Sequence, residues 1–281
     1  MVGKLCYICY ILHLHLTRPL VHKQATLAAT DLQGELILPL IEVPVEQIYY
    51  ETFDEGNGGW QGIRSNGSEG WLRLENIDGA IVSRSPWWID YNHAPPGIGY
   101  LNLLFALHTR IPSNYPDEFR KAGGPNRFVE GGFPVDFTNA EITVRIKGEL
   151  EARGSELVFL AQGHVGAHCV GHLLLGQPLK VTPEWSDQTI HLVPDPSQWK
   201  ALGVRHDRGE TYGWGDVKDV LKNLDVDFMF LLHPIDIVPD PPIEGDPHLL
   251  KAGEEYSVDR SRLPEGYVMM DEIRIRFASE K

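Results

Sequence analysis

The sequence predicts an all-β fold, an antiparallel sandwich or barrel built as one large domain. The chain has 281 residues, which suffices to bury a sizeable core. Its 28 glycines and 20 prolines make up about 17% of the residues, against a usual ~12%, and this excess favours many turns over long helices. From residue 48 onward, short alternating apolar and polar runs recur between turn residues. This spacing is typical of antiparallel sandwiches and barrels.

Residues 1–47 precede this pattern and are expected to form an N-terminal arm. Lys4 is followed by an apolar stretch at 5–16 that His13 and His15 interrupt. Such a stretch is too short to span a bilayer, which needs about 20 residues, so no membrane span is predicted. Its length fits the apolar part of a signal peptide, but the histidines and the lack of a small-x-small cleavage site argue against one. An arm or a degenerate signal segment stays open, as does a secreted or cytoplasmic location.

The predicted strands follow one another through residues 48–281. Residues 142–147 alternate apolar and polar side chains, the period-two pattern of a strand with one buried face, and residues 273–277 do the same. Further strands are predicted at 48–53, 71–75, 80–84, 100–108, 156–162, 172–181, 188–193 and 226–233. Turn clusters such as the run DEGNGG at 54–59 separate them.

One short helix is predicted after Asp216, which can serve as its N-cap. Val217, Val220, Leu221 and Leu224 follow at the i, i+3, i+4 and i+7 spacing of one apolar helix face. Loops longer than ordinary hairpin connections are predicted at 109–135, 163–171, 203–215 and 234–266. Long loops on a rigid scaffold often carry function, so these segments are candidate sites.

The charge of the chain disfavours two classes of partner. Asp and Glu number 39 against 25 Lys and Arg, a formal net charge of -14. Nucleic acids and anionic membrane surfaces attract clustered positive charge, so neither is a predicted partner. The acidic balance suits a neutral small ligand or bound cations. Three cysteines are too few for a disulfide framework. The oligomeric state is not predicted.

Short motifs over residues 48–278 share the pattern of one superfamily. They are YETFDEG with GW (50–56, 59–60), WWIDYNHAPPG (87–97), DFTNAE (136–141), W…TIHL…W (185–199), VLKNL (220–224) and MDEIRI (270–275). Together they resemble the galactose-binding-like jelly-roll superfamily, especially laminin IV-type domains and related carbohydrate-binding modules. The resemblance implies a jelly-roll β-sandwich over 48–281 and a carbohydrate or other small polar ligand.

The same resemblance implies a structural calcium ion between the opening and closing strands. Its ligands would be Glu51, Asp54 and Asp271. Calcium takes six to eight oxygen ligands, which carboxylates and loop carbonyls supply. The alternative is that these acids are solvated turn residues or caps, as most acids in glycine-rich turns are.

Aromatic residues in or beside loops are predicted to bind the carbohydrate. Sugar rings present apolar C–H faces that stack on aromatic rings, while neighbouring polar groups bond the hydroxyls. The candidate ligand-binding residues are Trp87, Trp88, Tyr91, His93, Tyr212 and Trp214. Three further tryptophans, Trp60, Trp185 and Trp199, are expected to fill the sandwich core.

An alternative function is a single-domain enzyme that acts on a glycoside or another small polar substrate. His206 and Asp207 are its leading acid–base pair, because histidine beside a carboxylate can transfer protons near neutral pH. His93, His164 and His168 are further catalytic candidates. Residues i and i+4 of one strand share a side, so His164 and His168 could converge, or they could be scattered loop histidines. The serine-hydrolase, zinc-protease and nucleotide-binding motifs are absent from the sequence.

Overall fold

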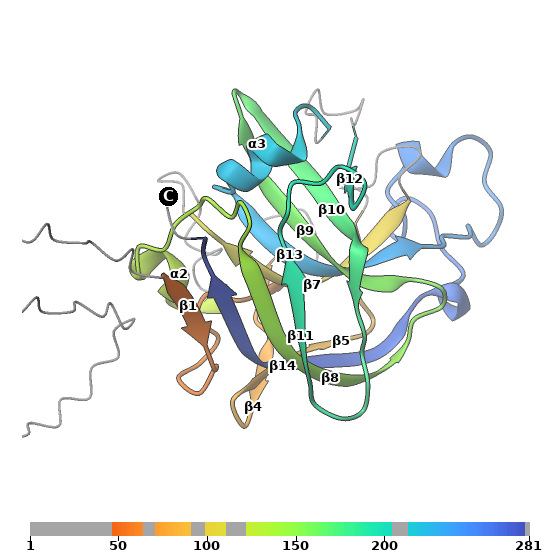
Figure 1. Ribbon diagram of the computed structural model, residues 1–281. Helices are drawn as coiled ribbons and strands as arrows, with labels where there is room; N and C mark the ends of the chain where they lie inside the picture. The colour runs from red at the N-terminus through yellow and green to blue at the C-terminus, as the bar shows by residue number, and fades with distance from the viewer. Residues whose placement is uncertain (1–46, 64–70, 91–98, 111–121, 204–212, 279–281) are drawn as a thin grey trace, which may run out of the picture.

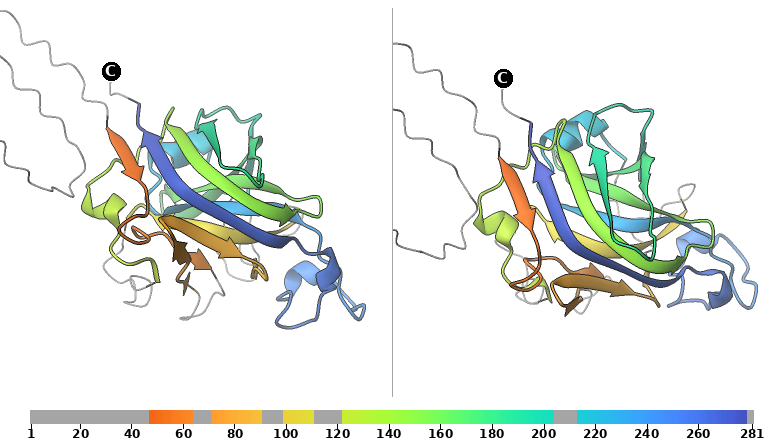
Figure 2. Two further views of the ribbon diagram at one scale, coloured as in Figure 1. Left: turned by 90° about the horizontal axis from the view of Figure 1, so that it is seen from below. Right: turned by 60° about the horizontal axis from the view of Figure 1, so that its bottom comes forward.

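The computed structural model describes residues 47–63, 71–90, 99–110, 122–203 and 213–278. Two antiparallel sheets lie against each other as separate layers (Figures 1 and 2). The first sheet has the order β11 (Ser186–His191), β8 (Glu141–Glu151), β14 (Glu265–Arg276), β5 (Ala80–Arg84) and β4 (Glu75–Ile77), and β1 (Ile48–Glu51) also pairs with β14. The second has the order β12 (Trp199–Ala201), β10 (His168–Leu179), β9 (Glu156–Val165), β13 (Asp227–Ile235), β7 (Tyr100–His108) and β6 (Ile89–Asp90). A small third sheet pairs β2 (Gly62–Ile63) with β3 (Trp71–Leu72).

This arrangement confirms the predicted fold class, an all-β antiparallel sandwich. The alternating stretch at 142–147 is β8, whose side chains alternate between buried and partly exposed along Glu141–Gly148. Ile142, Val144 and Ile146 point into the sandwich, where they meet apolar side chains such as Phe159 and Phe228 of the second sheet. The period of two therefore reports a strand with one buried face.

The second sheet is covered on both faces, and this explains its long apolar runs. All nine residues of β7 are buried. Leu104 faces the core between the sheets, whereas Leu101 and Leu103 join a separate cluster with Leu160 of β9 and Leu231 of β13. Successive strand residues point to opposite faces, so this separate cluster lies on the outer face of the second sheet. We call it the outer cluster.

The predicted helix is present as α3 (Val217–Lys222), with Val217, Val220 and Leu221 buried. Asp216 holds its N-cap position, although its side chain makes no capping hydrogen bond. The prediction of a single helix missed α2 (Arg127–Glu130), whose N-cap Asn126 accepts a hydrogen bond from the Val129 amide. A helix of four residues is too short to leave a periodic pattern, and the cap of α2 comes from one asparagine in a glycine-rich stretch.

The long loops have different outcomes. The predicted loop at 163–171 is wrong, because β9 and β10 extend through it and leave only Gly166 and Ala167 between their paired ends. The excursion at 236–264 holds two 3-10 turns, Pro247–Leu249 and Arg260–Arg262. The Tyr100 hydroxyl of β7 ties it down by donating to the Pro247 carbonyl at 2.7 Å. Of the predicted arm at 1–47, residues 1–46 lie outside the described residues. Within the described residues no helix is long and apolar enough to cross a membrane.

Candidate functional site

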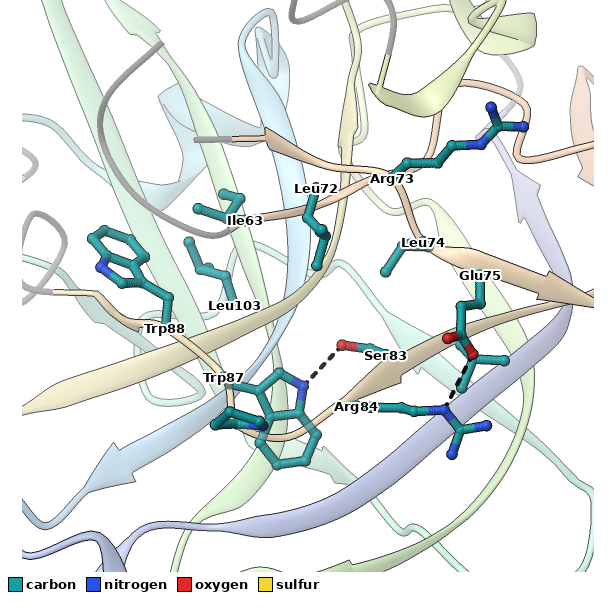
Figure 3. A pocket seen from close by; sticks show the side chains of 13 residues that line it. Ile63, Leu72, Arg73, Leu74, Glu75, Ser83, Arg84, Trp87, Trp88 and Leu103 are labelled. Carbon is teal, nitrogen blue, oxygen red and sulfur yellow. Dashed lines mark hydrogen bonds and ion pairs between the residues drawn. The ribbon is translucent and has the colours of Figure 1, made fainter. Parts of the chain in front are cut away.

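A groove of about 280 Å³ lies at one edge of the sandwich, and we call it the edge groove. It is lined by residues of β4 and β5 in the first sheet, by residues 86–88 between β5 and β6, by Leu103 of β7 and by the small sheet β2–β3. Its apolar lining comes from Ile63, Leu72, Leu74, Leu103, Trp87 and Trp88 (Figure 3). Its polar lining includes Arg73, Glu75, Ser83 and Arg84.

Each of the two tryptophans of the edge groove makes a hydrogen bond to a neighbouring strand. The indole N–H of Trp87 donates to the Ser83 hydroxyl of β5 at 2.9 Å, and the ring is largely buried. The carbonyl of Trp88 accepts a hydrogen bond from the Asn102 side chain of β7 at 2.8 Å. Trp88 itself is partly exposed. Both rings therefore start from a fixed backbone, which limits the entropy lost when a ligand orders them.

An ion pair borders the opposite side of the edge groove. The Arg84 Nε atom lies 3.2 Å from the Glu75 Oε2 atom, and both side chains are exposed. Figure 3 shows this pair across the lining from Trp88, with Leu72 and Leu74 between them. Exposed pairs add little stability, so this pair offers donors and acceptors to a ligand without being needed for the fold.

The chemistry of the edge groove suits one small ligand with both apolar and polar surface. Small-molecule sites are mostly apolar and aromatic, with a few placed polar groups, and enclose roughly 300–1,000 Å³. At about 280 Å³ the edge groove falls just below that range. It can hold one ring-sized group, with apolar contacts to Trp88 and Leu72 and hydrogen bonds to Glu75 and Arg84.

The structure divides the predicted ligand-binding residues. Trp87 and Trp88 line the edge groove, whereas Trp214 is 55% exposed and stacks on His168, with ring centroids 5.5 Å apart. Four strand spacings, or ~19 Å, separate β6 from β10 across the second sheet. The predicted ligand residues Tyr91, His93 and Tyr212 lie outside the described residues.

The structure also separates two of the catalytic candidates. His164 pairs with Cys169 across the β9–β10 hairpin, and His168 pairs with Val165. Neighbouring pairs point to opposite faces, so His164 and His168 do not share a side, and of the two alternatives left open by the sequence their convergence is excluded. The chain reverses between them, which cancels the i, i+4 rule. The candidates His93, His206 and Asp207 lie outside the described residues.

Two histidines of the β9–β10 hairpin, His164 and His172, contact different groups. The Nδ1 atom of His164 lies 3.0 Å from Oδ1 of Asp225, and the same oxygen accepts the His164 backbone N–H at 2.8 Å. His172 is buried, and its Nε2 atom lies 3.2 Å from the Gly215 carbonyl. Burial lowers the pKa of His172 from its ordinary value. Of these two histidines, His164 is the one with a ring nitrogen in contact with a carboxylate.

The three predicted calcium ligands contact different partners. Both Glu51 oxygens bind Arg127, while Asp54 accepts from the Thr52 hydroxyl at 2.7 Å. Asp271 lies 3.5 Å from Arg145, and burial is the main cause that raises its pKa. Within the described ranges, no group of three or more His, Cys, Asp or Glu side chains could hold a metal ion. The carboxylates as arranged do not fit a shared calcium site, and calcium stays a prediction of the sequence.

The three tryptophans that the sequence assigns to the core differ in burial. Trp60 is fully buried and stacks on Phe230, and Trp199 is 8% exposed. Trp185 is not in the core. It lies beside β8, with the Lys147 ammonium 4.6 Å and the Arg145 guanidinium 5.9 Å from its ring centre. Its ring is held by cation–π contacts where the sequence predicted apolar packing.

Comparison with known proteins finds only solved structures of low structural similarity. No family model and no curated protein matches the chain. Among solved structures, the L4b domain of human laminin α-2 matches with 11% identity and a TM-score of 0.25, covering 52% of this chain and 62% of that one. A structure of deformed wing virus carrying the GFP gene matches with 11% identity and a TM-score of 0.20, covering 99% of this chain and 58% of that one. Scores this low carry no argument about function.

Sequence reasoning missed a buried pair on the outer face of the second sheet. The Nδ1 atom of His108 lies 3.5 Å from Oδ2 of Asp227, and both side chains are almost fully buried. Burial lowers the pKa of His108 to about 4. The Trp71 ring meets the imidazole edge to face at 4.7 Å. The available signal was a polar residue at the end of each of two apolar strands, which also fits a solvated strand end.

Proposed function

We propose that the chain is a carbohydrate-binding β-sandwich of the laminin IV-like, galactose-binding-like type, which holds one sugar ring in the edge groove. One observation carries this proposal: two fixed tryptophans and an exposed Glu75–Arg84 pair line the same small groove. Aromatic rings next to bonding polar groups are what a sugar needs, because its ring has apolar C–H faces edged by hydroxyls.

Each lining residue has a stated task in this proposal. The partly exposed Trp88 ring contacts a C–H face of the sugar, and Leu72, 43% exposed, supports the other side of the ring. Glu75 accepts from hydroxyl groups and Arg84 donates to them. A neutral sugar also suits a chain with a formal charge of -14, which would repel an anionic ligand.

Tryptophan fluorescence during titration with a panel of mono- and oligosaccharides tests the proposal. We expect quenching on addition of at least one sugar, and loss of binding in Trp88→Ala. The matched control is Trp214→Ala, which removes an exposed tryptophan four strands away and should leave binding intact. Loss of binding in Trp214→Ala with retention in Trp88→Ala would overturn the assignment to the edge groove and place the site beside the β9–β10 hairpin. No response to any sugar would overturn the proposal.

The alternative proposal is an enzyme acting on a glycoside or another small polar substrate. The His164–Asp225 pair favours it, because a histidine oriented by a carboxylate can serve as a general base. His206 and Asp207 remain the leading acid–base pair of this alternative. Replacing His206 with Ala should lower turnover of aryl glycosides at least ~100-fold while the folded protein keeps its melting temperature. Absence of turnover in the unmodified chain would remove the alternative.

A further inference from the structure

Three reactive side chains lie in one row across the end of the second sheet. In the ladder between β13 and β9, Asp227 pairs with Gln162. Two residues further along both antiparallel strands, this register places Asp225 opposite His164, where the hydrogen bonds between them are found. His164 in turn pairs with Cys169 of β10. The position of His164 on β9 therefore lies between those of Asp225 and Cys169.

The thiol and the imidazole lie on the same face of the sheet. Residues directly opposite each other in an antiparallel pair project to one side, with Cβ atoms about 4.5–5.5 Å apart. Cys169 is partly buried against the outer cluster, whereas Val165, the residue after His164, packs against the core between the sheets. His164 and Cys169 therefore both belong to the outer face. The β9–β10 hairpin that carries them lies beside α3 (Figure 1).

The bond to Asp225 prepares His164 to act as a base. A carboxylate at Nδ1 favours the tautomer whose proton is on Nδ1, and that leaves the lone pair of Nε2 as an acceptor. The Asn223 side chain also donates to the His164 carbonyl at 3.2 Å, which fixes the backbone at this position. A nucleophile beside a base, with the base oriented by a third group, is the general arrangement of covalent catalysis.

A buried amide on the same face adds a hydrogen-bond donor. Gln162 is 2% exposed, and its Nε2 atom has no hydrogen-bond partner among the described residues. This atom lies 3.4 Å from where a Cβ of Gly171 would be, a position that the Leu202 side chain also borders, and Gly171 is two residues from Cys169 on β10. A preorganised N–H on the same face as a nucleophile can stabilise the negative charge that develops on a carbonyl oxygen.

We propose that Cys169 is a nucleophile for acyl transfer from small esters, with His164 as its base and Asp225 as the residue that positions the base. The thiol proton passes to Nε2 of His164 as the sulfur attacks the carbonyl carbon and a carbon–sulfur bond forms. The carbon–oxygen bond then breaks, and the departing alcohol takes the proton from His164. Water hydrolyses the thioester by the reverse use of the same base. Gln162 donates to the carbonyl oxygen.

The test measures the reactivity of the Cys169 thiol in a chain with Cys6→Ser and Cys9→Ser. Alkylation by iodoacetamide is followed from pH 5 to 10 on the folded protein. We expect the midpoint to lie at least one unit below the ~8.5 of an ordinary thiol, because an imidazolium stabilises the thiolate. His164→Ala should return the midpoint to that value, and Asp225→Asn should raise it by a smaller amount. His168→Ala, on the opposite face, is the control and should change nothing.

Neighbouring charges are tested in the same way. Asp227 and His108 lie in the next row of the outer face, and Lys222 ends α3 just before Asn223. Lys222→Gln should leave the midpoint in place, since the proposal assigns the effect to His164.

With p-nitrophenyl acetate we expect one equivalent of rapid nitrophenolate release, abolished by Cys169→Ser. An ordinary midpoint, or one unchanged by His164→Ala, would overturn this proposal. Neither result would bear on the proposed sugar binding in the edge groove.

Discussion

Arg127 of α2 holds both oxygens of Glu51 of β1, a residue 76 positions earlier in the chain. Its Nε atom lies 2.5 Å from Oε2 and its Nη2 atom 2.7 Å from Oε1, while Nη2 also donates to the Gly56 carbonyl. Glu51 is buried, so the pair fixes α2 against the first strand. Gly58 has a φ of +61°, and a side chain there would strike the Glu51 carboxylate, so the turn requires glycine.

Breaking this pair should destabilise the fold. Glu51→Gln leaves a partly buried guanidinium without its carboxylate, and we expect a loss of about 2–3 kcal/mol, below the ~3–5 kcal/mol of a fully buried pair. Urea unfolding measures this change. Arg153→Ala, which removes the exposed Arg153–Glu151 pair, is the matched control and should cost under ~0.5 kcal/mol. Equal losses in the two variants would contradict the structural role of Glu51.

The buried histidines predict a loss of stability in mild acid. Burial lowers the pKa values of His108 and His233 to about 4 in the folded chain, below the unfolded value of 6.5. The unfolded state therefore binds more protons between these values, and stability falls as the pH falls from about 6.5 to 4. For His108 the shift corresponds to on the order of 3 kcal/mol. Urea unfolding at several pH values measures how the free energy of unfolding depends on pH. We expect a weaker dependence in His108→Gln, and an unchanged dependence in that variant would contradict the role given to His108.

The exposed ion pair of the edge groove separates binding from stability. Arg84→Ala removes a donor to the ligand, and we expect sugar affinity to fall about tenfold, the value of one hydrogen bond of ~1.4 kcal/mol. The free energy of unfolding should change by less than ~0.5 kcal/mol because the pair is exposed. Titration calorimetry and urea unfolding on the same preparation give both numbers. A large loss of stability with unchanged affinity would assign Arg84 to the fold.

Calcium binding is a prediction that requires Glu51 to exchange Arg127 for the cation. A ligand that binds only the folded state raises its melting temperature. On this prediction calcium raises the melting temperature, EDTA lowers it, and Glu51→Gln removes both effects. Because Arg127 already binds both Glu51 oxygens, an unchanged melt is the competing outcome, and it would remove the calcium prediction.

The fold could be predicted from the sequence where one local rule decided the structure. The alternation in β8 was sufficient, because one face of that strand is buried and the other is open. The spacing of Val217, Val220 and Leu221 was sufficient for α3. Rules of spacing failed at His164 and His168, because a two-residue turn reverses the chain between them. They also failed at Trp185, which cations hold on the surface.

The candidate site could be predicted only in part. Trp87 and Trp88 were chosen because large rings beside loops are unusual, and both line the edge groove. Glu75 and Arg84 gave no signal in the sequence, because the groove forms only when β4 and β5 lie beside residues 86–88 and the small sheet β2–β3. The row of Asp225, His164 and Cys169 depends on strand register in the same way. Register is a property of three strands at once, and no single segment encodes it.

The double-sided burial of β7 restricts how this chain can vary. In β8 every second position from Glu141 to Lys147 is partly open, so a population of variants can exchange residues there without losing the fold. In β7 no position from Tyr100 to His108 has that freedom. Random mutagenesis followed by selection for soluble protein should therefore leave β7 almost invariant while β8 accumulates changes at alternate sites, and relatives too distant to align elsewhere should remain recognisable in β7.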